Sequence, residues 1–128
     1  MVTKKIILSI TLSLFLIFTT TNIFAEIPPS IFTAIESSNT GELTKYLNSS
    51  VELSILDKDD VYSKQQASVI LKDFFTKNKV KSFSIVHQGG KDGAQYAICK
   101  MGFVNGINYR IYFLVKDNLI HQFRITEE

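Results

Sequence analysis

An amphipathic pattern with helical spacing runs through residues 63–78, SKQQASVILKDFFTKN. Its apolar residues recur at i, i+3, i+4, i+7 and i+8, which places them on one side of a helix. Ser63 stands where an N-cap residue is expected, and Lys77 lies where a cation suits the helix dipole. The pattern predicts one helix whose apolar side must pack on a hydrophobic surface. That side consists of Ala67, Ile70, Leu71, Phe74 and Phe75.

Apolar and polar residues alternate in much of the second half of the chain, which is typical of strands. Asn105-Gly106 is the strongest short hairpin signal, and we expect it to form a two-residue type I′ turn. Asp117-Asn118 predicts a second tight turn, and the glycine-rich residues 89–93 predict a loop. These turns divide an antiparallel meander that curls around the helix. Its four strands are expected over residues 81–88, 94–104, 107–116 and 119–126.

Shorter signals precede the long helix. Two prolines at 28–29 suit the first turn of a helix, and Asn39 with Glu42 resembles a capping box, so we expect two short helices. Alternation over residues 51–55 predicts a strand, and residues 61–62 predict a short second one. The order of elements indicates an α+β domain, with helices packed on a curved antiparallel sheet.

The hairpin turns predict which side chains share a face of the sheet, because a two-residue turn fixes the register. If Val104 faces Ile107 across the first turn, then Cys99 faces Tyr112. We assign the more apolar face to the helix. It is expected to carry Phe83, Ile85, His87, Ala97, Cys99, Met101, Phe103, Arg110, Tyr112, Leu114, Leu119, His121, Phe123 and Ile125.

The opposite, outer face mixes polar residues with large apolar ones. It is more apolar than a fully solvated face, so the expected register predicts a homodimer through the outer sheet face. The residues expected there include Lys100, Gln122 and Arg124 beside Tyr96, Ile98, Ile111, Phe113 and Val115.

The first 25 residues have the pattern of a signal peptide. Lys4 and Lys5 are followed by the apolar run 6–18 and by residues 23–25, which end in a small residue. The run is short for a membrane span, and an uncleaved N-terminal anchor is the alternative. We expect cleavage after residue 25, a single domain over residues 26–128, no membrane attachment afterwards, and a periplasmic or secreted location.

Charge and cysteine content narrow the functional classes. Two of the 14 Lys and Arg residues lie in the expected leader, which leaves 12 basic residues against 12 acidic ones. A mature chain without net charge gives no argument for binding nucleic acid. The single cysteine, Cys99, excludes an internal disulfide. We expect it to be a buried strand residue, with a reactive thiol or an interchain disulfide as alternatives.

Five residues are candidates for a ligand pocket between helix and sheet, because the expected register turns them toward the helix. An Arg110–Tyr112 pair could hold a small anion or carboxylate, although Arg110 could instead pair with a helix carboxylate. The two histidines lack a suitably spaced carboxylate, and the acidic turn 57–60 lacks the pattern of an EF-hand, so neither a metal nor a cofactor is expected. The five candidates are Arg110, Tyr112, His121, Cys99 and His87.

Several short motifs occur in order across residues 28–126. They are Tyr62-Ser63-Lys64 with Gln66-Ala67, Asp73-Phe74-Phe75, His87-Gln88-Gly89, Tyr109-Arg110 and Gln122-Phe123-Arg124-Ile125. With the order of elements they resemble the DUF4783 family of exported NTF2-like (cystatin-like fold) proteins of Bacteroidetes. The resemblance implies an NTF2-like cone, with N-terminal helices and one long helix packed on a curved antiparallel sheet, and an exported location. It implies no particular activity, and this chain has Cys99 where a glycine is expected.

Three hypotheses about function remain open at this point. The leading one is an exported, non-enzymatic domain that binds a small ligand or a partner protein. The second is a small isomerase- or dehydratase-like enzyme with its site in the cone, where Asp73 is the nearest acidic candidate. The third is a purely structural interaction module whose cone is filled by phenylalanine side chains.

Cleavage of the leader can be tested directly. We expect the protein isolated from its own host's exported fraction to begin at Glu26, which N-terminal sequencing or the intact mass would show. A chain that begins at Met1 and sediments with membranes would contradict the signal-peptide interpretation.

Overall fold

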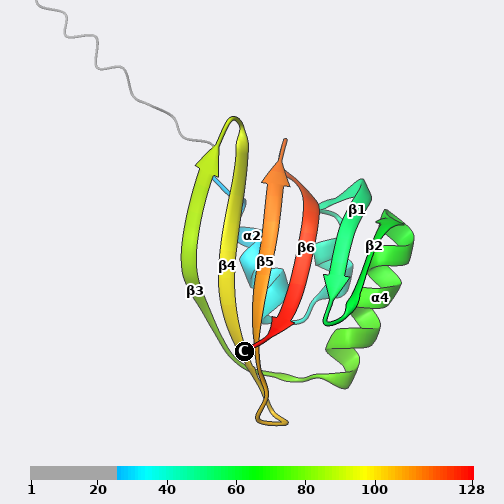
Figure 1. Cartoon of the computed structure of the whole chain (residues 1–128), viewed down its shortest axis with the longest axis vertical. Helices are drawn as coiled ribbons and strands as arrows, with labels where there is room; N and C mark the ends of the chain where they lie inside the picture. Colours follow the sequence, from blue (N-terminus) through cyan, green and yellow to red (C-terminus); the bar gives the residue numbers. More distant parts are fainter. Residues whose placement is uncertain (1–25) are drawn as a thin grey trace, which may run out of the picture.

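The computed structural model describes residues 26–128, and the predicted signal peptide lies outside this part. Three helices and six strands form a small α+β fold (Figure 1). The helices are α2 (Pro29–Glu36), α3 (Thr40–Thr44) and α4 (Lys64–Lys77). The strands are β1 (Leu47–Ile55), β2 (Lys58–Ser63), β3 (Val80–Lys91), β4 (Ala94–Phe103), β5 (Asn108–Lys116) and β6 (Leu119–Glu127).

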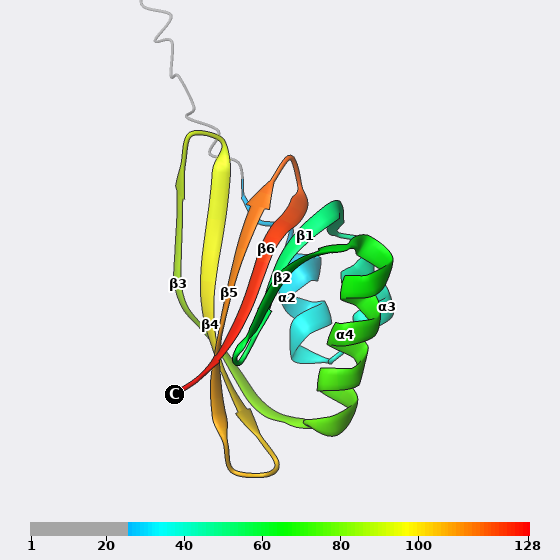
Figure 2. The ribbon, with the colours of Figure 1, turned by 45° about the vertical axis from the view of Figure 1, so that its right-hand side comes forward.

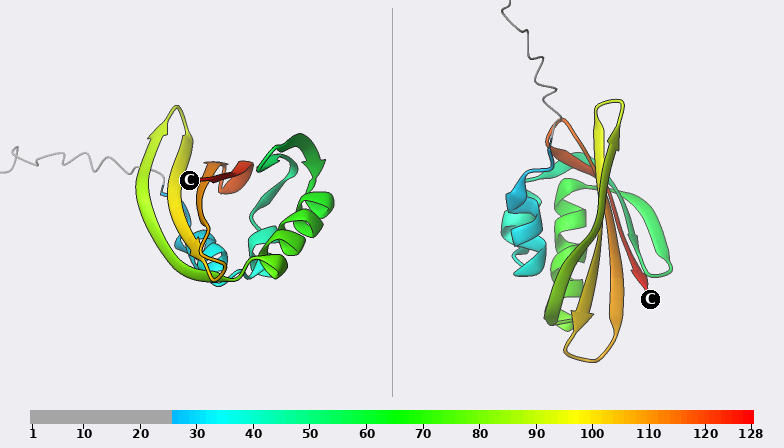
Figure 3. Two further views of the ribbon diagram at one scale, coloured as in Figure 1. Left: turned by 60° about the horizontal axis from the view of Figure 1, so that its bottom comes forward. Right: turned by 90° about the vertical axis from the view of Figure 1, so that its left-hand side faces the viewer.

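The strands form one sheet in the order β2-β1-β6-β5-β4-β3, which curves without closing (Figure 3). Neighbouring strands are antiparallel except β1 and β6, which run parallel. The three helices lie on one side of the sheet (Figure 2). The sheet therefore has a helix-covered face and an outer face that no helix of residues 26–128 covers.

The loop between β4 and β5 is one residue longer than expected, and this changes the face of every β5 side chain. The amide of Phe103 donates to the carbonyl of Ile107 at 3.0 Å, and within the loop so enclosed only Gly106 has a positive φ, of 86°. A type I′ turn needs positive φ at both central residues, whereas a type I turn followed by a left-handed glycine gives a three-residue loop. Cys99 therefore lies opposite Ile111, and the expected faces of β5 were wrong.

The shifted register changes which β5 side chains lie on the helix-covered face. The buried side chains of β5 are Tyr109, Ile111, Phe113 and Val115. Arg110, Tyr112 and Leu114 alternate with them and lie on the outer face.

Strand β6 departs from the expected register at a bulge. Leu114 pairs with Gln122 but Val115 pairs with Ile120, so His121 is the extra residue. Phe123 and Ile125 are buried on the helix-covered face as expected. Ile120 is buried there in place of the expected Leu119 and His121.

The other two turns of the β3–β6 meander are short. Asp117-Asn118 has positive φ at both residues, 53° and 62°, which confirms the predicted tight turn. Strand β3 continues through Gly89 and Gly90 of the expected loop to Lys91, so the connection to β4 is only Asp92-Gly93. The prediction of a five-residue glycine-rich loop was therefore wrong.

Helix α4 begins and packs as the sequence predicts. The Ser63 hydroxyl accepts a hydrogen bond from the Gln66 amide, and the Gln66 side chain accepts one from the Ser63 amide, both at 3.2 Å. The ring of Phe74 packs edge-on against Phe103 and Tyr109, with centroids 5.9 and 5.6 Å away. This aromatic cluster fixes the helix on the sheet. The buried residues of α4 are Ala67, Leu71, Phe74 and Phe75.

The two short helices cover a neighbouring part of the same face. Phe32 of α2 packs against Phe113 of β5, with ring centroids 5.5 Å apart. The Asn39 side chain accepts a hydrogen bond from the Glu42 amide at 3.1 Å, which confirms the predicted cap of α3. No helix within residues 26–128 has the length and apolar content that a membrane crossing needs.

Replacing Ser63 by Ala removes the acceptor that caps α4. We expect the substitution to lower the free energy of unfolding by about 0.5–2 kcal/mol in urea denaturation. Ser84→Ala is the control, because that side chain is exposed on β3, and it should change the free energy by less than about 0.5 kcal/mol. Equal effects of the two substitutions would contradict the capping role.

Candidate functional site

A cavity of about 740 Å³ lies between α4 and the strands β1, β2 and β5. Ile70 and Phe74 line it from α4, because residues four apart lie on the same side of a helix. Leu53 and Ile55 line it from β1, because alternate strand residues share a face, and Tyr109 lines it from β5. The wall is therefore mainly apolar. The remaining lining residues are Leu56, Lys58, Tyr62, Val69, Asp73, Lys77 and Asn78.

Polar residues line the cavity from β2, which carries Lys58, and from the C-terminal half of α4. Asp73 and Lys77 form an ion pair at 3.0 Å, and their side chains are 62% and 71% exposed. The Asn78 amide donates to the carbonyl of Phe74 at 2.9 Å. Because an exposed ion pair holds its partners weakly, both charges are available to a molecule that enters the cavity.

The five sequence candidates do not gather at this cavity. Cys99 is fully buried in the core on the helix-covered face, as expected for a small apolar strand residue. Burial raises the pKa of its thiol to about 12. The thiol is therefore protonated at neutral pH and lacks the thiolate character of a nucleophile.

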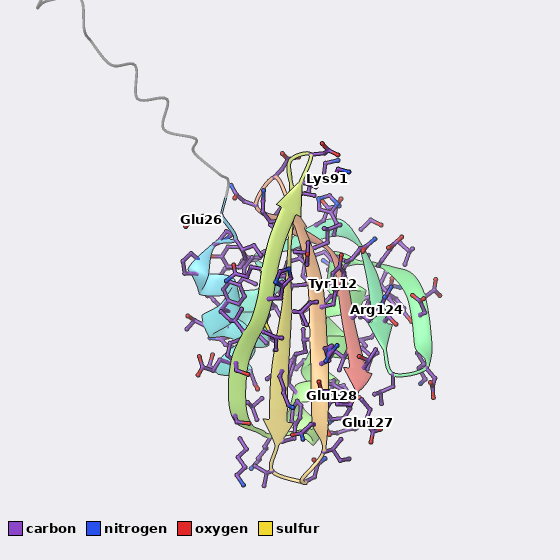
Figure 4. The ribbon with its side chains drawn as sticks, turned by 60° about the vertical axis from the view of Figure 1, so that its left-hand side comes forward. Glu26, Lys91, Tyr112, Arg124, Glu127 and Glu128 are labelled. Carbon is purple, nitrogen blue, oxygen red and sulfur yellow. The ribbon has the colours of Figure 1, made fainter. Side chains whose placement is uncertain are left out.

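Arg110 and Tyr112 lie on the outer face, so the expectation that they face the helices was wrong. Arg110 donates to a carboxylate oxygen of Glu128 at 2.8 Å, and Lys100 pairs with the same carboxylate at 2.9 Å. The hydrogen bonds from Lys100 and then Arg110 lower the pKa of that carboxyl group. Tyr112 lies beside Arg124 of the next strand, whose guanidinium carbon is 5.9 Å from the ring centroid (Figure 4).

The two histidines are also outside the cavity. His87 is exposed, and its Nε2 atom lies 3.0 Å from the Tyr96 hydroxyl. His121 is the half-buried bulge residue of β6, in a depression also lined by Asn48 and Glu52. A ligand role for any of the five candidates stays a prediction. No group of three or more His, Cys, Asp or Glu side chains within residues 26–128 could hold a metal ion.

Sequence reasoning missed part of the cavity for an identifiable reason. The expected register assigned Tyr109 to the outer face, so its place in the cavity was missed. Phe74 and Ile70 were recognised as parts of the apolar side of the helix. The alternation of Leu53 and Ile55 was a usable signal, because it marks two apolar residues on the same face of β1.

The outer face is less apolar than expected. Ile111, Phe113 and Val115, whose expected exposure suggested a homodimer, are buried on the helix-covered face. Of the apolar residues expected outside, Tyr96 and Ile98 do lie there and are half-buried. Homodimerisation through the outer face stays a prediction, and fewer apolar residues on that face now support it.

A family model described as "Domain of unknown function (DUF4783)" matches residues 28–127. The chain belongs to the DUF4783 family. Solved DUF4783 family proteins from Bacteroides ovatus ATCC 8483 and Bacteroides fragilis YCH46 are 36% and 33% identical to it, with TM-scores of 0.75 and 0.74. Both matches cover 80% of this chain, and they cover 96% and 100% of the other chains. No curated protein matches the chain.

This DUF4783 protein shares its fold with more distant proteins. An LEH-like epoxide hydrolase from M. tuberculosis is 10% identical, with a TM-score of 0.59, and the match covers 78% of each chain. An Rd1NTF2 protein is 14% identical, with a TM-score of 0.58, and the match covers 76% of this chain and 90% of that one. Identities this low show a similar fold and nothing about activity. The neighbours therefore confirm a small α+β fold with NTF2-like relatives.

The burial of Cys99 predicts an unreactive thiol. We expect iodoacetamide at mildly alkaline pH to leave the folded protein unmodified, because the thiol is buried and its pKa is raised. The same reagent should modify the chain fully in guanidinium chloride, and intact mass measures both outcomes. Rapid modification of the folded protein would show that Cys99 is accessible and contradict its place in the core.

Proposed function

We propose that this chain is an exported, non-enzymatic domain with an NTF2-like cone, and that the cavity beside α4 binds a small amphiphilic ligand. The observation that carries the proposal is the cavity itself, with a volume of about 740 Å³ and a mainly apolar wall. Small-molecule sites in proteins typically have volumes of about 300–1,000 Å³, apolar walls and a few polar groups.

The lining residues indicate the chemistry of that ligand. The wall formed by Leu53, Ile70 and Phe74 favours a hydrocarbon chain or an aromatic ring, because each CH₂ group moved out of water contributes about 0.8 kcal/mol. Lys58 and Lys77 also line the cavity, against the single carboxylate of Asp73. The excess positive charge favours an anionic end group, such as a carboxylate.

An enzyme with its site in the cone is the alternative. Proton transfer needs a histidine or carboxyl group held at the substrate in the correct protonation state. Asp73 is largely exposed and paired with Lys77, and no histidine is among the residues that line the cavity. The epoxide hydrolase activity in the name of a distant neighbour belongs to that protein. These observations favour binding over catalysis.

Export is the other part of the proposal. It rests on the leader-like pattern of residues 1–25. An exported binding domain would meet its ligand in the periplasm or outside the cell.

The cavity can be tested with 1-anilinonaphthalene-8-sulfonate, a fluorescent probe with an apolar ring system and an anionic group. We expect the wild type to bind the probe, and Ile70→Trp to weaken binding about tenfold or more, because the indole ring would occupy the cavity. Val86→Trp is the matched control, since it adds the same ring at a site on β3 that is 56% exposed.

Urea denaturation of the three proteins would first establish that each is folded. Equal probe affinity of the wild type, Ile70→Trp and Val86→Trp would show that the probe binds elsewhere. That result, or a wild type that does not bind the probe, would contradict the proposed cavity function.

A further inference from the structure

A second, polar cleft lies on the other side of the molecule. It has a volume of about 330 Å³ and is formed on the outer face where β5, β6, β1 and β2 lie side by side. It does not share a lining residue with the cavity beside α4. The residues that line it are Glu52, Ser54, Asp59, Asp60, Val61, Tyr112, Gln122, Phe123 and Arg124.

The strand register explains why a cleft forms here. Arg124 of β6 pairs with Ser54 of β1, which in turn pairs with Asp59 of β2. Neighbouring strands are about 4.8 Å apart, so the backbones that carry Arg124 and Asp59 are separated by roughly 10 Å. Ser54 has a short side chain and lies between two long or charged ones. It therefore forms the floor of a gap with a cation on one side and a carboxylate on the other.

Arg124 is available to a ligand. Its guanidinium lies over the ring of Tyr112, at 5.9 Å from the centroid (Figure 4). This contact holds the cation on the β5 side of the cleft. Among residues 26–128, Arg124 makes no ion pair with a carboxylate, whereas Arg110 and Lys100 on the same face both pair with Glu128. An unpaired guanidinium presents the donor geometry that matches a carboxylate.

The other charged residues that line the cleft are acidic. Glu52 is held in place by Gln122, whose amide donates to its carboxylate at 2.7 Å. Asp59 lies beside Ser54 on β2, and Asp60 also lines the cleft, where its carboxylate accepts a hydrogen bond from the Val61 amide at 2.8 Å. Three carboxylates and one guanidinium therefore line the cleft, which carries an excess of negative charge.

We propose that this cleft binds a basic α-amino acid, with its carboxylate on Arg124 and its ammonium groups on Asp59 and Glu52. A zwitterion satisfies both walls at once, which a simple anion or a simple amine cannot do. The acidic excess favours a ligand with a second positive charge, so lysine should bind more tightly than alanine, and glutamate should not bind measurably. This binding does not depend on the proposed function of the cavity beside α4, because the two sites lie on different faces of the sheet.

The test is a titration of the folded, isotope-labelled protein with free lysine, followed by amide chemical shifts at constant ionic strength. We expect saturable shifts at Ser54, Asp59 and Arg124, weaker ones with alanine, and none with glutamate.

Arg124→Gln should weaken lysine binding about tenfold, since a hydrogen-bonded charge pair is lost. Ser54→Phe keeps every charge and should abolish binding by filling the gap. Arg110→Gln, on the same face outside the cleft, should leave the affinity within about twofold.

Other results would overturn the proposal. Shifts that match those caused by sodium chloride, or equal responses to lysine and glutamate, would show general charge effects only. A loss in Arg110→Gln as large as in Arg124→Gln would place binding elsewhere on the face. The absence of saturable shifts with millimolar lysine in a protein with well-dispersed amide signals would also exclude the site. Failure here would leave the dye-binding result untouched, so the two proposals are distinguishable.

Discussion

The packing of Phe74 against Phe103 and Tyr109 is the contact on which the arrangement of this molecule depends. It joins the long helix to two neighbouring strands of the meander, in a core where Phe103 is 1% and Tyr109 5% exposed. Truncation of a buried aromatic ring of this kind costs about 3–5 kcal/mol, a large part of the stability of a small domain. Because the same ring lines the cavity, the contact that positions α4 also sets one wall of the candidate site.

The extra residue in the loop between β4 and β5 decides which β5 side chains lie on each face of the sheet. The three-residue loop after Phe103 turns Tyr109 and Ile111 inward and Arg110 and Tyr112 outward. The inward residues complete an apolar core and cavity. Of the outward residues, Tyr112 lines the polar cleft beside Arg124, whereas Arg110 lies outside the cleft and pairs with Glu128. A slip of one position would exchange these two sets, because side chains alternate along a strand.

Much of the fold could be predicted from the sequence, because its signals are local. The Ser63 cap, the apolar side of α4 and the Asn39 cap depend on residues within one or two helical turns, and all were confirmed. The register was not predictable in the same way, since Asn105-Gly106 fits both a two-residue type I′ turn and a type I turn with a left-handed glycine. The same register error put Arg110 and Tyr112 on the wrong face in the predicted site. The bulge at His121 caused a second error, and no local sequence pattern marks that bulge.

The structure gives the domain two distinct faces: an apolar cavity under the helix, and a charged cleft on the open side of the sheet. The ligand of the cavity is the central claim, and native mass spectrometry of the protein purified gently from its own host tests it most directly. We expect a folded species that carries a defined extra mass, and Ile70→Trp, which fills the cavity, should be free of it. A bare mass for the wild type in every preparation, or the same adduct on Ile70→Trp, would contradict ligand binding beside α4.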